Sequence, residues 1–382
     1  MRPDPEAVFA YAAGQVEQAA HGLWPRAKVV MGPVVPSVSS YVQQVEVDGR
    51  LLFAKLSVLG VSLVSLLRGA CGEWPDVLQA QAAYINSPGA LLERERDQLR
   101  TLRGPAGLRV PDAPGYDRGV LFTEPAHGPT LADLIAKDPG RTAELLGLVV
   151  AEVVAGLGQR GVAARVEKTE IRERSITATF LRKFNGLSGG AYLRQTDHAA
   201  TLTTVVSRLR LAQRVVAPPI RAVVFGDLKP EHAVFPDTGG RPVFLDPGLM
   251  RGRPAGDPAK LVSRLVLNLI ASPSADIRNV RAVLGGIAAF AASMTACTDR
   301  AGRDAWLRQL TLLWLMDTTN ILSTYLSAPA GLPLARHAAA TIGRARAVCD
   351  MLDRSTAALT SFRDARSVWR LCLDAAAKAA AS

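Results

Sequence analysis

Alternating apolar and polar positions predict a small antiparallel sheet near the start of the chain. Residues 27–35 and 40–47 are rich in Val and alternate in polarity, and residues 51–56 predict a third strand. Asp48-Gly49, between the last two strands, is a dipeptide typical of hairpin turns. Before the sheet, residues 4–22 place apolar side chains at helical spacing. The pattern therefore predicts one helix followed by a meander of three strands.

A mostly helical pattern fills the rest of the chain. Apolar residues predict helices at 88–103, 143–161, 176–184, 199–215, 261–271, 280–298, 304–327, 337–359 and 361–380. Residues 120–131 predict a strand that runs into a helix capped by Thr130. A last strand region, predicted to form a hairpin, interrupts the helices at 222–248. The pattern is that of an α+β chain with a sheet in its first part and helices in its second.

The predicted hairpin at 222–248 carries the residues with the clearest chemistry. Its first half reads Val224-Phe225-Gly226-Asp227-Leu228-Lys229-Pro230-Glu231-His232, and its second reads Val243-Phe244-Leu245-Asp246-Pro247-Gly248. A hairpin that presents Asp227, His232 and Asp246 at one edge suits divalent-cation chemistry on a phosphate. One carboxylate can take a proton from a hydroxyl while the other two groups hold Mg²⁺. The plainer interpretation, surface acids and a capping His, explains each residue singly but not the whole spacing.

This order of residues resembles the aminoglycoside-phosphotransferase family of the protein-kinase-like superfamily. The resemblance implies a two-lobed fold, with an ATP-covering lobe at 1–122, a hinge at 123–130 and a helical lobe at 131–382. It implies ATP- or GTP-dependent and Mg²⁺-dependent phosphorylation of a hydroxyl on a small molecule, such as an antibiotic, a nucleoside or a sugar derivative. It makes Asp227 the catalytic base, with Lys229 beside it to meet developing negative charge. It makes His232 and Asp246 the metal ligands.

Lys55 is a lone charge in the apolar strand at 51–56. A buried ammonium without a partner is costly, so this side chain must pair with an acid or bind a ligand. The family resemblance gives Lys55 a phosphate-binding role and places a partner Glu on the next long helix. Within Arg94-Glu95-Arg96-Asp97-Gln98-Leu99 the choice is Glu95, and Glu93 is the alternative. The two face different sides of the helix.

The remaining nucleotide contacts are expected at two loops. The loop between the first two strands offers the small hydroxyl residues Ser37, Ser39 and Ser40 toward phosphate, although two prolines in it remove backbone donors. The resemblance implies that backbone groups near Glu124 and Ala126, in the hinge, bind adenine.

Three departures from the family pattern keep other hypotheses open. Phe225 replaces the common His before Gly-Asp, and His232 replaces the usual Asn. After Gly256-Asp257-Pro258 the second Asp, which braces the catalytic loop, is absent, since Lys260 or Leu261 stands there. Asp257 is then expected only as a helix cap. A catalytically inactive kinase-like binding module is one alternative, and a kinase of a primary metabolite or of a protein is another. Residues 57–87 form an insertion without an assigned role.

The composition of the chain limits the kinds of partner to be expected. The 382-residue chain has a net charge of +11, but only 5% of its residues are aromatic and no basic run is interleaved with them, so nucleic acid is not an expected partner. No apolar run has the length of a membrane span, and the first residues lack an apolar signal segment. Four scattered cysteines fit reduced thiols. We therefore expect a cytoplasmic protein without a membrane partner, and the oligomeric state stays open.

The net charge of the chain also limits the kind of small molecule whose hydroxyl could accept the phosphoryl group, which is called the acceptor below. A polycationic aminoglycoside needs several carboxylates around its binding site, and the chain is basic with pI near 9.9. The acceptor is therefore expected to be neutral or anionic. By position in the sequence it is expected near Asp317 and Trp314.

Overall fold

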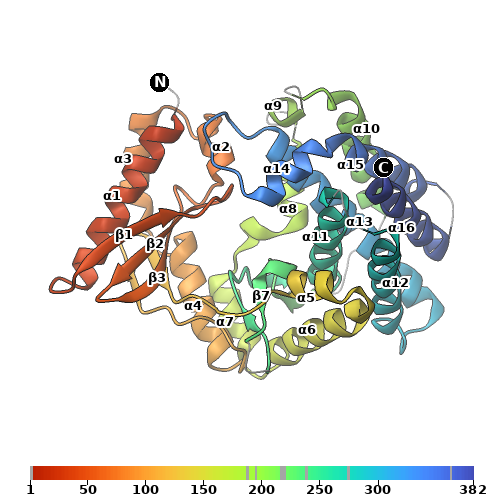
Figure 1. Cartoon of the computed structure of the whole chain (residues 1–382), viewed down its shortest axis with the longest axis horizontal. Coiled ribbons are helices and arrows are strands. Elements are labelled where there is room, and N and C mark those ends of the chain that lie inside the picture. The colour runs from red at the N-terminus through yellow and green to blue at the C-terminus, as the bar shows by residue number, and fades with distance from the viewer. Residues whose placement is uncertain are drawn as a thin grey trace.

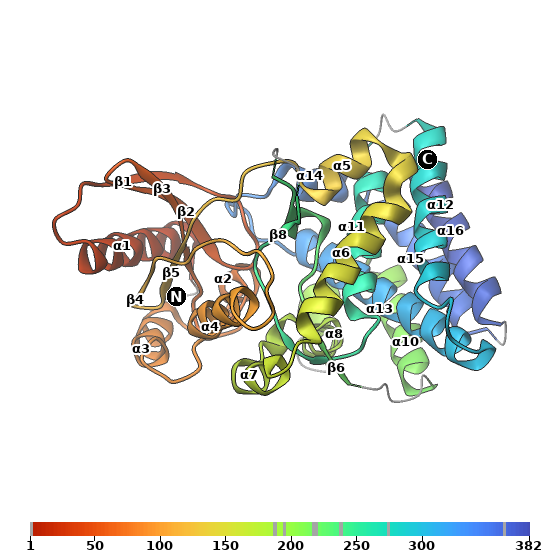
Figure 2. The ribbon, with the colours of Figure 1, turned by 90° about the horizontal axis from the view of Figure 1, so that it is seen from below.

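A sheet-containing part and a larger helical part lie side by side in the computed structural model and meet along a narrow middle section (Figures 1 and 2). The structure describes residues 3–185, 189–193, 196–215, 221–236, 240–272, 276–361 and 364–382. This arrangement agrees with the predicted α+β, two-lobed architecture. The exact lobe boundaries at 122 and 131 stay a prediction.

Five antiparallel strands form the sheet of the first part, in the order β1-β2-β3-β5-β4. Their bounds are β1 Val29–Val34, β2 Tyr41–Val47, β3 Arg50–Leu56, β4 Gly115–Asp117 and β5 Val120–Thr123. β3 is the central strand, so Lys55 lies between Val42 of β2 and Leu121 of β5. The central position explains why every residue from Leu51 to Leu56 other than Lys55 is apolar.

Four helices accompany the sheet: α1 Pro5–Leu23, α2 Leu63–Leu67, α3 Trp74–Tyr84 and α4 Leu91–Arg103. Asp4 caps α1, since its carboxylate accepts the Ala7 N–H at 2.9 Å. Ala12, Val16 and other small apolar residues of α1 are buried in one cluster with the sheet. The insertion at 57–87 forms α2 and α3, and α4 carries the predicted Glu pair.

The second part is built around one long helix. Its helices are α5 Leu131–Lys137, α6 Thr142–Leu157, α7 Val162–Thr169, α8 Ile176–Lys183, α9 Gly189–Leu193, α10 Ala199–Val215, α11 Gly256–Ala271, α12 Ile277–Ser293, α13 Arg300–Leu326, α14 Arg336–Gly343, α15 Ala345–Leu359 and α16 Ala365–Ala381, with 3₁₀ turns η1 Pro139–Arg141, η2 Arg172–Arg174 and η3 Pro230–His232. α13 is buried almost continuously from Leu307 to Ser323 and contacts α8, α11, α15 and α16. It therefore forms the centre of the helical core.

Several predicted boundaries were wrong for local reasons. The helix predicted at 143–161 ends at Leu157, because the chain turns at Gly161, whose φ is +85°, before α7 begins. The helix predicted at 337–359 is two helices that break at Arg344. The helix predicted from residue 88 starts at Leu91, after Gly89 at φ +93°.

The hairpin predicted at 222–248 is two separate ladders. β6 Ala222–Val224 pairs with β9 Met250–Gly252, and β7 Ala233–Val234 pairs with β8 Val243–Phe244. Residues 237–239 of this region lie outside the described residues. The first strand therefore finds its partner beyond the predicted range, and the acidic loop is held at both ends.

Among the described helices, none is by itself long and apolar enough to cross a membrane. The segments Pro139–Leu157 and Val162–Thr169 meet the length and composition test only when taken together, and they are bent by 92° at their junction.

Candidate active site

The loop that carries Asp227 is fixed by close backbone packing. Gly226 has φ +81°, and a Cβ added there would lie 2.0 Å from the carbonyl oxygen of Gly248. Only glycine fits this approach without strain. The Gly248 N–H in turn donates to the Phe225 carbonyl at 3.0 Å. The two predicted motifs, far apart in the sequence, are therefore in direct contact.

Lys55 joins the two parts of the molecule. Its ammonium donates to the Glu95 carboxylate at 2.9 and 3.3 Å and to Asp246 Oδ1 at 3.0 Å. Glu95 is only 2% exposed. Burial would lower the pKa of Lys55, but the Asp246 and Glu95 carboxylates raise it, so the side chain is charged. Strand β3, helix α4 and the loop after β8 thus meet at one ammonium group.

Arg174 completes this ion-pair network. Its guanidinium donates to Glu95, to the Asp246 carbonyl at 3.0 Å and to the Pro247 carbonyl at 2.5 Å. Burial would raise the pKa of Asp246, but Lys55 and other nearby cations hold it below its ordinary value. Asp246 has φ +50°, a backbone conformation that is uncommon for a side chain other than Gly and that recurs at functional sites.

Asp227 is paired with two lysines. Lys229 Nζ lies 2.8 Å from its Oδ2, and Lys260 Nζ lies 2.6 Å from its Oδ1. Burial alone would raise the pKa of Asp227, but Lys229 and Lys260 outweigh it and hold that pKa well below its usual range. Asp227 is therefore an ionised carboxylate at neutral pH. Lys260 also donates to the Arg174 carbonyl at 3.1 Å, which ties the two halves of the site together.

His232 faces Asp246 in the form that binds metals. Its Nδ1 lies 3.0 Å from the Asp227 carbonyl oxygen. A carbonyl only accepts, so Nδ1 carries the proton and Nε2 presents its lone pair toward Asp246 Oδ2, 3.8 Å away. Burial, with Lys229 nearby, lowers the pKa of His232 to about 4, which keeps the ring neutral.

These two residues fit a divalent cation bound together with phosphate. They supply one imidazole nitrogen and one carboxylate, and no cluster of three or more His, Cys, Asp or Glu ligands exists in the described residues. Mg²⁺ commonly takes only one or two protein ligands and completes its shell with substrate phosphates and water. The donor set therefore suits a metal that arrives with a nucleotide, not a permanently caged one.

Asp257 corrects one expectation from the sequence. It was expected as a helix cap, and the missing second Asp left the bracing of the catalytic loop an open question. Instead its two carboxylate oxygens accept the N–H groups of Phe225 and Gly226, both at 2.7 Å. Burial raises the pKa of Asp257 to about 6, although these two bonds oppose the shift. The loop is therefore braced by the first Asp of the motif, without the second.

Phe225, the other departure from the family pattern, is fully buried. Its ring lies 5.8 Å from that of Phe244, and its side chain belongs to the main core cluster. The residue before Gly226 thus packs the two ladders together and takes no part in the polar site.

The loop predicted to cover phosphate makes hydrogen bonds within itself and to the start of α2. Ser37 Oγ accepts the N–H groups of Ser39 and Ser40 at 3.2 and 3.4 Å. The carbonyls of Val38 and Ser39 accept N–H groups at the start of α2. Phosphate contacts from these serines stay a prediction, and they require exchange of the present bonds.

The two predicted hinge residues, Glu124 and Ala126, differ in whether their backbone groups already make hydrogen bonds. The Glu124 N–H donates to the Asp112 carbonyl at 2.8 Å, and its carboxylate pairs with Arg50. Within the described part of the chain, the backbone of Ala126 makes no hydrogen bond with another backbone group. A ligand base can therefore use the backbone of Ala126, whereas the N–H of Glu124 is already bonded. Adenine binding at this hinge stays a prediction.

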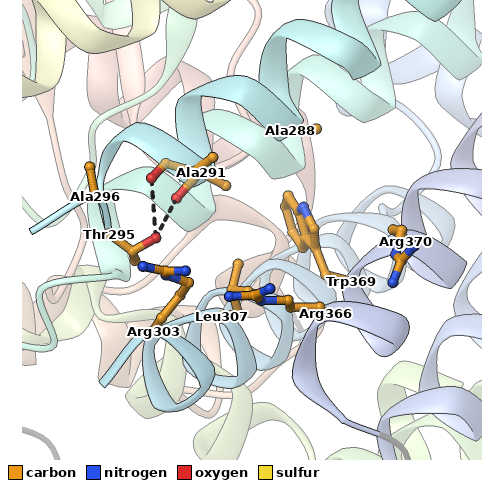
Figure 3. Close-up of a pocket in the computed structure, with 10 residues that line it drawn as sticks. Ala288, Ala291, Thr295, Ala296, Arg303, Leu307, Arg366, Trp369 and Arg370 are labelled. Carbon is orange, nitrogen blue, oxygen red and sulfur yellow. Dashed lines mark hydrogen bonds between the residues drawn. The ribbon is translucent and has the colours of Figure 1, made fainter. Parts of the chain in front are cut away.

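A cavity of about 580 Å³ is lined by residues of α12, α13 and α16 (Figure 3). These helices lie at the end of the helical part away from the sheet (Figure 2). The described residues of the cavity lining include Arg303, Arg366 and Arg370 beside apolar side chains such as Trp369, and none of them is a carboxylate. Trp314 is fully buried against Trp369, with ring centroids 5.6 Å apart. The expectation that Trp314 borders the acceptor was therefore wrong, because its indole packs into the core toward α16.

Two residues of the ion-pair network around Asp227 and Asp246 were not predicted from the sequence. Lys260 is a lone charge between apolar neighbours on α11, the same signal that singled out Lys55. Arg174 sits in Arg172-Glu173-Arg174, where nothing in the sequence distinguishes the buried arginine from the exposed one.

Comparison with known proteins establishes the fold. No family model matches the chain, and no curated protein matches it. The GDP complex of wild-type aminoglycoside 2'-phosphotransferase-IIIa has a TM-score of 0.51 and 14% identity, over 88% of this chain and 97% of that chain. Plasmodium vivax ethanolamine kinase has a TM-score of 0.50 and 10% identity, over 93% of both chains. The chain therefore has the two-lobed, protein-kinase-like fold of these small-molecule kinases.

Proposed function

We propose that the protein is a kinase that transfers the terminal phosphoryl group of ATP or GTP to a hydroxyl of a small molecule. One observation carries this proposal. Five side chains from distant segments meet at one place between the two parts of the chain. They are the charged Lys55 with its buried partner Glu95, Asp246 with its positive φ, the neutral His232 and the ionised Asp227. Both structural neighbours are small-molecule kinases or phosphotransferases by name, and one of them binds GDP.

Each side chain has a distinct task in this proposal. Lys55, held by Glu95, neutralises phosphate charge. Asp246 and His232 would hold Mg²⁺, which when bound offsets the charge of the nucleotide phosphates. Asp227 orients the acceptor hydroxyl and accepts its proton as the phosphoryl group is transferred.

The two lysines on Asp227 are not equivalent. The Lys229 side chain is 23% exposed, whereas that of Lys260 is 7% exposed and bonded to a backbone carbonyl as well. Lys229 is therefore the one able to move toward a transferring phosphoryl group and leave one carboxylate oxygen for the hydroxyl. Lys260 keeps the Asp227 carboxylate ionised and fixes its orientation.

The main alternative is a kinase-like module that binds a ligand without catalysis. Two features of the sequence favoured it, the Phe at position 225 and the missing second Asp. Both have a local explanation, since Phe225 packs the core and Asp257 braces the loop. Active chemistry is therefore the better-supported function. A primary metabolite or a protein remains an alternative acceptor.

The test is acceptor-dependent ADP or GDP release. Purified protein with ATP or GTP and Mg²⁺ is screened against pooled hydroxylated antibiotics, nucleosides and sugar derivatives. For the acceptor found, Asp227→Asn is expected to reduce turnover by about 10²–10⁴-fold, because it removes the base. Nucleotide affinity should stay near that of the parent protein, since Asp227 acts on the acceptor.

Asp353→Asn is the matched control, because Asp353 pairs with Arg208 away from the site and its side chain is 46% exposed. It should leave turnover unchanged. Nucleotide binding without any release above that of Asp227→Asn would favour the inactive module instead.

A further inference from the structure

Helix α11 directs a row of polar side chains at the catalytic loop. Asp257 braces the loop, Lys260 pairs with Asp227, and Arg264 follows one turn later on the same face. Arg264 Nε and Asp317 Oδ2 are both buried and make no hydrogen bond among the described residues, and they face each other as a loose ion pair at 3.9 Å. A guanidinium with a buried, unbonded donor next to the base is suited to an anionic partner.

The positive charge continues away from the base. Lys183 of α8 donates to the Asn320 carbonyl at 2.5 Å and to the Thr324 hydroxyl, which leaves one of its N–H groups, and its Nζ lies 5.1 Å from the centroid of the Tyr192 ring. The Arg68 guanidinium, which follows α2, lies 4.7 Å from the centroid of the same ring. Two cations from different parts of the molecule therefore share one aromatic ring.

The charges of this region do not balance. Among the described groups that act on Lys229, Arg264 and Lys183, the basic residues, counting these three, are Lys229, Lys260, Arg264, Lys183, Arg182 and Arg68, and the carboxylates are Asp227, Asp317 and Glu231. Two of the lysines already serve Asp227. Burial, followed by the repulsion of Arg182, lowers the pKa of Lys183 to about 7, and the Arg264 and Arg68 charges act in the same direction. The region therefore holds more positive charge than its own acids neutralise.

We propose that the acceptor carries an anionic group, a carboxylate or a phosphate monoester, and that Arg264, Lys183 and Arg68 bind this group while the acceptor hydroxyl lies at Asp227. The inference rests on the proposed kinase function and names its substrate class. Charge-assisted hydrogen bonds to a guanidinium are among the stronger polar contacts, and an anion supplies the partner that Arg264 Nε lacks. A polycationic acceptor would meet like charge at the same place.

The first experiment compares acceptors that differ only in charge. Matched sets are glycerol, glycerate and glycerol 3-phosphate; glucose, gluconate and glucose 6-phosphate; and uridine and uridine monophosphate. Acceptor-dependent ADP release should favour an anionic member over its neutral partner by about tenfold or more in kcat/KM. The carboxylate and phosphate arms tell the two anionic sources apart. Turnover of a neutral member equal to or better than its anionic partners would overturn the inference while leaving the kinase function intact.

The second experiment measures binding without turnover. The protein is saturated with Mg·ADP, so that its phosphate-binding groups are occupied, and thermal unfolding is followed with each acceptor. The anionic members should raise the Tm, and Arg264→Gln should weaken the apparent affinity by about tenfold. Arg354→Gln on α15, which removes an exposed arginine, is the control and should change nothing. Absence of anion binding to the parent protein, or an unchanged affinity in Arg264→Gln, would overturn the inference whether or not a kinase activity is found. Conversely, anion binding lost in Arg264→Gln but without ADP release from any acceptor would support the site and count against the kinase function.

Discussion

Replacing Glu95 by Gln tests how the site is held together. Glu95 is 2% exposed and is the carboxylate shared by Lys55 and Arg174. At an effective dielectric of about 20, a charge pair at the 2.9 Å of Lys55 and Glu95 attracts by about 6 kcal/mol before desolvation is subtracted. Breaking a buried pair by removing one partner costs about 3–5 kcal/mol, because the remaining charge is left uncompensated. For a chain of 382 residues the Tm should therefore fall by about 4–6 °C.

The same change should affect the metal site. Once Glu95 is neutral, Asp246 is the remaining carboxylate within hydrogen-bond distance of Lys55, which lies 3.0 Å from its Oδ1. Lys55 then competes more strongly with a divalent cation for that carboxylate. We expect weaker binding of Mg·nucleotide, measured by titrating Mg²⁺ at a fixed nucleotide concentration, in addition to the lower Tm.

Glu93→Gln is the matched control. It lies on the same helix two residues earlier, its side chain is 36% exposed, and its pairing with Arg96 at 3.6 Å is a surface contact. Such pairs contribute about 0–1 kcal/mol, so the Tm should barely move. If Glu95→Gln unfolds within about 1 kcal/mol of the parent, or no more easily than Glu93→Gln, the network does not hold the site as described.

Three further changes probe the loop and its ligands. Asp257→Ala leaves two buried backbone N–H groups without acceptors, so unfolding should become easier by about 2–5 kcal/mol in denaturant titration, and a change below 1 kcal/mol would show that the brace is dispensable. Gly226→Ala places a Cβ within 2.0 Å of the Gly248 carbonyl oxygen at a positive φ, so it should lower the free energy of unfolding by at least about 2 kcal/mol and reduce the soluble yield. A variant as stable as the parent would show that the loop tolerates the Cβ. The pKa of His232 is lowered to about 4 in the fold from an ordinary value near 6.5, so its share of stability is complete above pH 6.5 and is lost as pH falls toward 4. His232→Asn should therefore flatten the loss of Tm between pH 6.5 and 4, and an unchanged pH profile would contradict the buried neutral ring.

The sequence was most informative where one residue broke a local pattern. Lys55 interrupts an apolar strand, and that mismatch alone predicts a partner. The choice of Glu95 over Glu93 followed from the resemblance to the family motif, and the structure places Glu95 on a buried face with Leu91, Leu92 and Leu99. The local pattern predicted that Lys55 has a partner, and the family motif was needed to predict which residue, 40 positions further along the sequence, that partner is.

Prediction was weaker where tertiary packing chooses among similar residues. Arg172 and Arg174 flank the same Glu, and only the approach of the Asp246 loop buries the second arginine. Asp257 gave the signal of an N-terminal cap, whereas its real partners are backbone groups 31 and 32 residues away. The break between α14 and α15 has no Pro or strong turn dipeptide, so the two helices were predicted as one.

The insertion at 57–87 attaches the two parts of the molecule at a place separate from the hinge and from the ion pairs of Lys55 and Arg174. Leu63, Leu66 and Leu67 of α2 share an apolar cluster with Leu332, and Figure 1 shows the chain before α14 reaching this helix. Ser65 also bonds the Tyr192 hydroxyl at 2.7 Å. Any movement of one part against the other must therefore disturb the packing of α2 as well as the ion pairs of Lys55 and Arg174. The insertion thus restrains the same movement as the buried charges do, at a separate place in the molecule.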